Sequence, residues 1–173
     1  MILIISTCRD KLHYFEFVKP VEDIAGDCRT KHYSKLTTTD LKKADRIIIC
    51  GTSLLDNKFM EDINKFEWIK NTTASILGIC AGMQIIGKIF GGSLKRKTEI
   101  GYFKEYFDDF LGLIGKQKVY HLYNYYVDFP KKFKIYSKSK IPHAVRYKNC
   151  YGVLFHPEVR QKFIIQNFLG STQ

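Results

Sequence analysis

A cysteine between two glycines is the residue best suited to covalent chemistry in this sequence of 173 residues. Cys80 lies in the motif Gly-Ile-Cys-Ala-Gly at 78–82, after the apolar segment 74–79 and before the segment 82–90, whose apolar residues have helical spacing. A sharp turn from strand to helix lifts such a side chain above the sheet edge and leaves room only for glycine on either side. The helix dipole favours the thiolate, and the amide of Ala81 points toward an oxyanion near the sulfur. The pattern predicts a nucleophile, although the motif alone also fits a buried cysteine beside packing glycines.

A thiolate catalyst needs a base, and among the five histidines His156 has the most suitable position. It follows the apolar segment 151–155 and opens the motif His-Pro-Glu. Because the ends of parallel strands share one edge of a sheet, we expect His156 and Cys80 to meet there. Glu158 is placed to accept the other imidazole N–H and to stabilise the imidazolium. The sequence therefore predicts a Cys80–His156–Glu158 triad; taken alone, His156 also fits a structural histidine at a strand end.

These two motifs together resemble the class I (triad type) glutamine amidotransferase domain. The resemblance rests on Gly-Ile-Cys-Ala-Gly-Met-Gln at 78–84 and Phe-His-Pro-Glu at 155–158, and it covers most of the chain. The segment 39–51 is similar to the strand that leads into the family's oxyanion loop, and 90–93 to the segment after the nucleophile helix. The resemblance implies hydrolysis of the glutamine side-chain amide, with ammonia passed to a synthase partner or fused domain. It implies no cofactor and no metal for this half-reaction.

The resemblance also implies which residues contact the substrate. Cys80 is the implied nucleophile, His156 the base and Glu158 the group that orients it. Gln84 matches a glutamine that helps to hold the substrate, and the segment 123–127 lies where relatives bind the α-amino and carboxylate ends. The residues expected to bind the substrate or the oxyanion are Gly51, Thr52, Ala81, Gln84, Asn124 and Tyr125.

The oxyanion loop departs from the family pattern. It is usually Gly-Gly-Pro, whereas this chain has Gly51-Thr52-Ser53. Because the family uses a backbone amide here, the side chain of Thr52 need not remove the donor, but threonine tolerates positive φ poorly. The loss of one oxyanion donor costs about 10²–10³ in rate. The sequence leaves open whether this loop works before a partner reshapes it.

The elements that position these residues follow from the hydrophobic pattern. Apolar runs predict buried strands at 2–5, 46–50 and 74–79, with another at 29–33. Helices are predicted at 12–18, 41–44, 56–71, 82–90 and 159–169, and the second of them has an N-cap at 39–40. Short strands are expected at 118–122, 125–127, 133–137, 144–147 and 151–155. The last of these strands could rejoin the central sheet. The pattern predicts one three-layer α/β domain over 1–173, with a mostly parallel sheet between helices and antiparallel strands in the second half; the resemblance implies the flavodoxin-like amidotransferase fold.

Composition places the chain among ordinary globular proteins. Hydrophobic residues make up 45% and charged residues 26%, and no apolar run is long enough to span a membrane. The apolar start at 1–5 lacks the basic region of a secretory signal. The five cysteines include no C-x-x-C pair, so a disulfide framework or a zinc knuckle is not expected. We therefore expect a cytoplasmic protein.

The net charge of +11 leaves several partners open. The lysines are spread along the whole chain, so we interpret most of them as solvent-exposed surface residues. A surface that binds a partner or an anionic ligand is the second interpretation, and nucleic-acid binding is the third. Among ammonia acceptors, the glutaminase subunit of a two-chain GMP synthase is the leading single hypothesis, with other synthases open. The alternatives are a stand-alone hydrolase of γ-glutamyl or other small amides, and a non-catalytic regulatory or nucleic-acid-binding protein of the same fold.

Overall fold

A seven-stranded sheet forms the centre of the computed structural model, which describes residues 1–170. The strand order is β2-β1-β3-β4-β9-β8-β7. The parallel strands are β1 (Ile2–Ser6), β2 (Arg29–His32), β3 (Arg46–Ile49), β4 (Ser75–Ile79) and β9 (Cys150–Val153), and the antiparallel ones are β8 (Ala144–Tyr147) and β7 (Lys134–Ile135). The predicted return of the last strand to the central sheet is confirmed, because β9 pairs with β4 in parallel.

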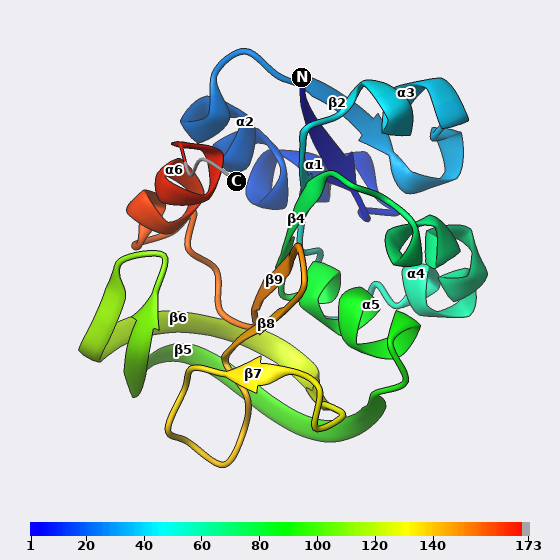
Figure 1. Ribbon diagram of the computed structural model, residues 1–173. Coiled ribbons are helices and arrows are strands. Elements are labelled where there is room, and N and C mark those ends of the chain that lie inside the picture. The colour runs from blue at the N-terminus through cyan, green and yellow to red at the C-terminus, as the bar shows by residue number, and fades with distance from the viewer. Residues whose placement is uncertain (171–173) are drawn as a thin grey trace.

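Helices cover both faces of this sheet and make three layers (Figure 1). They are α1 (Lys11–Phe17), α2 (Lys19–Ala25), α3 (Thr38–Lys43), α4 (Lys58–Glu61), α5 (Ala81–Ile89) and α6 (Lys162–Gly170), with 3₁₀ turns at Tyr33–Lys35 and Ile63–Lys70. Helices α2 and α6 pack together on one side, and α5 lies on the other against β3, β4 and β9. Among the described helices, none has the length and apolar character that a membrane crossing requires. The predicted α/β architecture with a mostly parallel sheet is confirmed.

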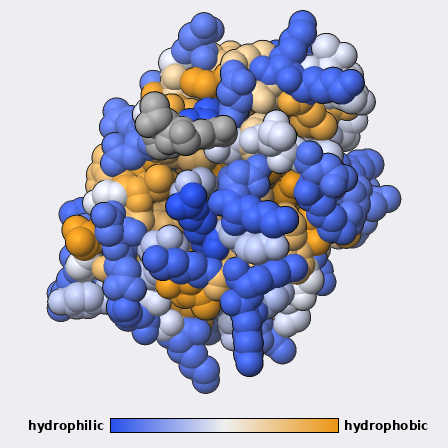
Figure 2. Space-filling model, in the orientation of Figure 1, coloured by the Kyte–Doolittle hydropathy of each residue, from blue (hydrophilic) through white to orange (hydrophobic). Residues whose placement is uncertain are grey.

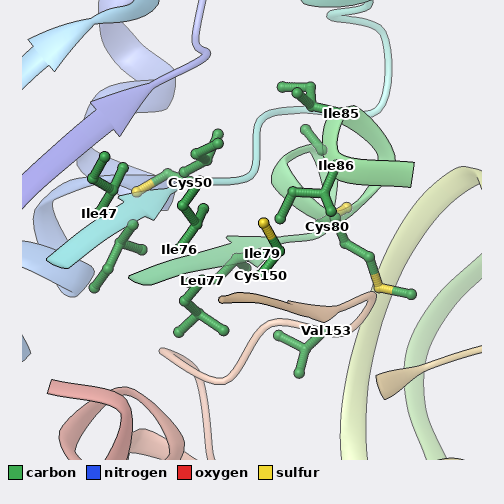
Figure 3. Packing of buried hydrophobic residues seen from close by; sticks show 14 of the residues in the cluster. Ile47, Cys50, Ile76, Leu77, Ile79, Cys80, Ile85, Ile86, Cys150 and Val153 are labelled. Carbon is green, nitrogen blue, oxygen red and sulfur yellow. The ribbon is translucent and has the colours of Figure 1, made fainter. Parts of the chain in front are cut away.

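The core consists of the apolar runs that identify the strands. Leu3, Ile47 and Ile76 are fully buried at paired positions of three neighbouring strands, on the face of the sheet that α5 covers, whereas Leu77 points to the opposite face (Figure 3). Ile85 and Ile86 of α5 are fully buried as well. Strands covered on both faces have no polar side, which explains continuous apolar runs in place of alternation. The outer surface is different: hydrophilic side chains cover most of the face seen in Figure 2, with apolar areas between them.

A long antiparallel ribbon lies beside β8 and β7 and corrects one prediction (Figure 1). It consists of β5 (Ser93–Phe110) and β6 (Leu113–Asp128). The separate strands expected at 118–122 and 125–127 are one continuous strand, and the hydrophobic pattern does not predict its partner β5. Burial along β5 alternates residue by residue only over 98–108, and lysines and aromatics occur on the exposed face, so the hydrophobic contrast is weak.

Other boundaries differ for local physical reasons. The helix predicted over 56–71 is only α4 followed by a 3₁₀ turn, because its apolar residues recur every three positions, at Ile63, Phe66 and Ile69, as 3₁₀ geometry requires. The sequence does not predict helix α2, because Pro20 indicates the end of the preceding helix. Pro20 instead lies in the first turn of α2, where proline fits well. The N-cap of α3 is Thr37 in a capping box with Asp40, not the predicted pair at 39–40. The strand at 133–137 shortens to β7, and the terminal helix begins at 162.

Candidate active site

The sharp turn predicted around Cys80 is present between β4 and α5 (Figure 3). Cys80 has φ 49° and ψ −100°, a conformation that is strained for a residue with a side chain. Its N–H donates to Val153 O at 2.8 Å, which ties the turn to the neighbouring strand β9. The strained residue is thus held by the sheet on one side and by the helix on the other.

The two flanking glycines are required by close backbone contacts. A Cβ added at Gly78 would lie 2.5 Å from Gly82 C, and one added at Gly82 would lie 2.2 Å from Ile49 O. Both distances are to backbone atoms, which cannot move aside cheaply. The glycines around Cys80 therefore allow the helix to start directly against β3 and β4.

His156 and Glu158 form a buried pair after β9. His156 Nδ1 lies 2.8 Å from Glu158 Oε1, and the exposed fractions of the two side chains are 1% and 2%. His156 N–H donates to Tyr120 O at 3.0 Å, and the ring of Phe17 packs on the imidazole at a centroid distance of 5.5 Å. This arrangement fixes the ring and places the proton on Nδ1, because an ionised carboxylate can only accept it.

Gly51 brings the imidazole and the cysteine together. A Cβ added at Gly51 would lie 2.7 Å from His156 Cε1 and 3.3 Å from Cys80 Cβ. The two side chains therefore flank the same glycine at the end of β3. Cys80 Sγ donates to Leu122 O at 3.5 Å, whereas His156 Nε2 is buried without a hydrogen-bond partner among the described residues. A rotation of the sulfur from the carbonyl of Leu122 toward Nε2 would join the thiol to the base.

The surroundings of His156 favour its protonated form. Burial alone lowers the pKa of His156, but the Glu158 carboxylate and the Cys80 sulfur outweigh burial and hold that pKa well above its ordinary value. A proton transferred from the thiol is thus stabilised on the imidazole.

The loop after Gly51 is anchored through Thr52. Thr52 Oγ1 donates to Asp56 Oδ2 at 2.9 Å, and the same carboxylate oxygen accepts from Arg9 N–H at 2.6 Å. Thr52 does not adopt positive φ, so its side chain causes no strain of the kind that the sequence suggested. The departure from a second glycine adds an anchor for the loop.

Five of the six residues predicted to bind the substrate or the oxyanion line a small cavity beside Cys80, and Gly51 does not. Gln84 Nε2 donates to Tyr125 O at 2.7 Å, and Asn124 Nδ2 donates to Leu54 O at 3.1 Å. The cavity has a volume of about 20 Å³ and is lined by Thr52, Ser53, Leu54, Asp56, Asn57, Phe59, Cys80, Ala81, Gln84, Leu122, Tyr123, Asn124 and Tyr125. That volume holds about one water molecule. The Asn124–Leu54 hydrogen bond joins two segments that line this cavity, β6 and the loop after β3.

Comparison with known proteins identifies the family. The family model described as glutamine amidotransferase class-I matches residues 23–169. The chain belongs to the class I glutamine amidotransferase family. The predicted resemblance is therefore confirmed.

Curated relatives of this amidotransferase include chains of GMP synthases. The chain is 32% identical over 120 residues to a subunit of the glutamine-hydrolyzing GMP synthase of Methanobrevibacter smithii, covering 61% of this chain and 63% of that one. It is also 32% identical over 142 residues to the corresponding subunit of Pyrococcus abyssi, covering 70% and 72%. Against the GMP synthase of Staphylococcus carnosus it spans 22% of the relative's length.

Solved structures agree on the fold of the amidotransferase. A Thermoplasma acidophilum protein provisionally named as a GMP synthase subunit superposes with a TM-score of 0.84 at 20% identity, over 98% of this chain and 92% of that one. A glutamine amidotransferase from Thermotoga maritima superposes with a TM-score of 0.70 at 16% identity, over 91% and 76%.

Sequence reasoning missed three contacts of the amidotransferase site. The carbonyl of Leu122 holds the sulfur, the carbonyl of Leu54 accepts from Asn124, and Asp56 anchors the loop. Backbone carbonyls leave no trace in residue types, so the first two had no signal. Asp56 had one, since an aspartate a few residues after a threonine can bond within a turn.

Proposed function

We propose that the chain is a glutaminase that hydrolyses the side-chain amide of glutamine through a Cys80 thioester and delivers ammonia to a synthase partner. The observation that carries the proposal is that Cys80 and the imidazole of the His156–Glu158 pair lie next to the same point, the one that a Cβ of Gly51 would occupy. Membership in the family and the names of the GMP synthase relatives support the substrate and the existence of a partner. GMP synthase is the leading acceptor.

The first half of the proposed reaction forms the thioester. The Cys80 thiolate attacks the amide carbon, and the amides of Ala81 and of the Gly51–Thr52 loop receive the oxyanion. His156 gives its proton to the leaving nitrogen, the C–N bond breaks, and ammonia departs. The γ-glutamyl group then remains on the sulfur.

The second half releases glutamate. His156 takes a proton from water, the resulting hydroxide attacks the thioester, and the C–S bond breaks to restore the thiolate. Glu158 stays ionised throughout and stabilises each imidazolium stage. These steps need only the side chains and backbone amides named above.

The small cavity supports dependence on a partner over stand-alone hydrolysis. At about 20 Å³ it has room for about one water molecule, and the Asn124–Leu54 hydrogen bond ties β6 to the loop on the other side of the cavity. A partner that moves the loop at 52–57 would open the site at the moment when an ammonia acceptor is present. Wasteful hydrolysis is then limited.

The test is covalent labelling with a glutamine analogue that carries a diazoketone in place of the carboxamide, followed by intact mass. We expect one adduct on Cys80, blocked by excess glutamine, absent in Cys80→Ser and strongly slowed in His156→Ala. Cys28→Ser, which changes a half-buried cysteine, serves as the matched control and should label normally. If the wild-type chain forms no adduct, either alone or mixed with the synthase chain of an archaeal two-chain GMP synthase, the proposal is wrong.

A further inference from the structure

A cluster of ionisable side chains is buried behind the active-site wall, on the inner face of the β5–β6 ribbon. Its members are Glu99, His121, Tyr123 and His143, and we call it the Glu99 cluster. His121, Tyr123 and His143 are each at most 1% exposed. Since successive side chains on a strand point to opposite faces, His121 and Tyr123 face away from the side on which Asn124 meets the substrate loop. The mechanism above uses none of these side chains.

The donor atoms of the cluster are close together. Glu99 Oε2 lies 2.8 Å from His121 Nδ1 and 4.0 Å from His143 Nε2. The Tyr123 hydroxyl donates to the same carboxylate and lies 3.1 Å from His143 Nε2. One donor atom from each of Glu99, His121 and His143 lies within 4.8 Å of the others.

The acidic side chains of the cluster have no basic partner. Glu105 joins the cluster, with Oε2 at 3.7 Å from His143 Nδ1. Among residues 1–170, no lysine or arginine forms an ion pair with Glu99 or Glu105. The two carboxyl groups therefore face only imidazole, hydroxyl and phenol groups, which can all act as metal ligands or support them.

We propose that Glu99, His121 and His143 bind a divalent transition-metal ion, best matched by Zn²⁺, with the Tyr123 hydroxyl as a fourth donor. Neutral imidazole and carboxylate are ligands that Zn²⁺ prefers. Bonds of about 2.0–2.2 Å place neighbouring donors of a tetrahedral site roughly 3.3 Å apart. The donor distances of 2.8, 3.1 and 4.0 Å lie around this value, so the donor atoms have nearly the required spacing, although the orientation of one ring has to change. Ser139 Oγ, at 2.9 Å from His143 Nδ1, then supports His143 from the outer shell, with Glu105 Oε2 farther away at 3.7 Å.

One ring has to turn when the ion binds. The imidazoles of His121 and His143 are stacked with centroids 4.5 Å apart and planes inclined by 15°, whereas a metal lies in the plane of each ring that it bonds. His121 is also stacked on Phe103 at 4.6 Å and belongs to β6. His143 precedes β8 in an irregular segment. We therefore expect His143 to turn and His121 to stay in place.

The ion has a structural role and takes no part in glutamine hydrolysis. It would tie β5 and β6, which carry Glu99 and His121, to the segment that carries His143. Between His121 and Tyr123 stands Leu122, whose carbonyl holds the Cys80 sulfur. A metal at this position would stiffen the wall of the substrate cavity from behind. The site is independent of the proposed function, because it uses no residue of the triad.

The experiment measures metal on the full chain. Chelator-treated protein is titrated with Zn²⁺ by calorimetry, and metal content after dialysis is measured by mass spectrometry. We expect one equivalent of zinc. Outer-shell changes typically weaken metal affinity roughly 10–100-fold, and the loss of a ligand in His121→Gln or His143→Gln should exceed that. Cys80→Ser and His13→Gln are the matched controls and should keep the ion.

Two results would overturn the site. One is a wild-type chain that takes up no zinc. The other is zinc that is lost in Cys80→Ser and kept in His143→Gln, which would place the ion at the catalytic thiol. If the histidine variants fail to fold, the spectrum of wild-type protein loaded with Co²⁺ decides. Tetrahedral bands without thiolate charge transfer support the Glu99 cluster, and a thiolate band refutes it.

Discussion

Replacement of Glu158 by glutamine tests the charge coupling on which the proposed catalysis depends. Glutamine has nearly the shape of glutamate and can still accept a hydrogen bond from His156 Nδ1, so the change removes mainly the negative charge. With Nδ1 and Oε1 2.8 Å apart, the centres of the two delocalised charges lie roughly 4 Å apart, where an effective dielectric constant of 20 gives about 4 kcal/mol. Both side chains are buried, so salt and solvent screen this interaction little.

The expected effect is a fall in the pKa of His156, because the negative charge that favours the imidazolium is removed. In the wild-type chain the pKa of His156 is raised, so the imidazolium persists above the ordinary value; in Glu158→Gln it is lost as pH rises through the lowered value. If the thiolate depends on this imidazolium, labelling of Cys80 by the diazoketone analogue at neutral pH slows by about 10²–10³-fold.

The assay is the rate of adduct formation by intact mass across pH, with the titration of His156 followed by NMR. Glu61→Gln, which removes an exposed carboxylate, is the matched control and should leave both curves unchanged. A Glu158→Gln variant that labels within about 3-fold of the wild type, with the same titration of His156, would refute the reasoning, because a coupling of about 4 kcal/mol cannot be lost without a shift of that pKa.

Three further predictions concern other parts of the structure. Gly51→Ala puts a methyl group 2.7 Å from His156 Cε1 and should slow labelling by about 10²-fold, whereas Gly170→Ala, which meets no atom within 4 Å, should not; equal rates would contradict the close packing. Asn124→Ala removes the hydrogen bond to Leu54 O, worth about 1 kcal/mol, together with the one that Thr98 Oγ1 donates, and should raise the rate of Cys80 alkylation by iodoacetamide about 5-fold; an unchanged rate would mean that the bond to Leu54 does not restrict access to the sulfur. Burial holds the pKa of His143 at about 3, so protein treated with chelator should lose up to about 1.4 kcal/mol of unfolding free energy for each pH unit below about 6.5. Urea unfolding of His143→Gln should lack this contribution, and an equal dependence of stability on pH in both proteins would contradict the prediction.

The parts that the sequence predicts well are those where local pattern and final environment agree. The apolar runs of β1, β3 and β4 are buried on both faces, so hydrophobicity alone identifies them. The turn at Cys80 can be predicted because close backbone contacts there require glycine, and glycines are visible in the sequence. His156 and Glu158 follow from the rule that neighbouring strand ends meet.

The parts that the sequence misses depend on partners far away in the chain. Half of the β5–β6 ribbon faces solvent, and its lysines and tyrosines hide the alternation of a strand. The residues of the Glu99 cluster come from β5, β6 and the segment before β8. No spacing in the sequence therefore predicts the cluster. The cavity wall is made partly by backbone carbonyls, such as that of Leu122, which any residue type can provide.

The pairing of β9 with β4 has a consequence for the way in which this molecule assembles. Leu77 lies opposite Tyr151 in this ladder, and Cys80 N–H closes on the carbonyl of Val153. A slip of two positions would shift the imidazole by roughly 7 Å along the strand and out of reach of the sulfur. If the proposed triad is correct, Cys80 gains its nucleophilic reactivity only when β9 has docked in its native alignment. Quenched-flow labelling of the Cys80 sulfur during refolding would measure when β9 pairs with β4, two strands that are distant in the chain.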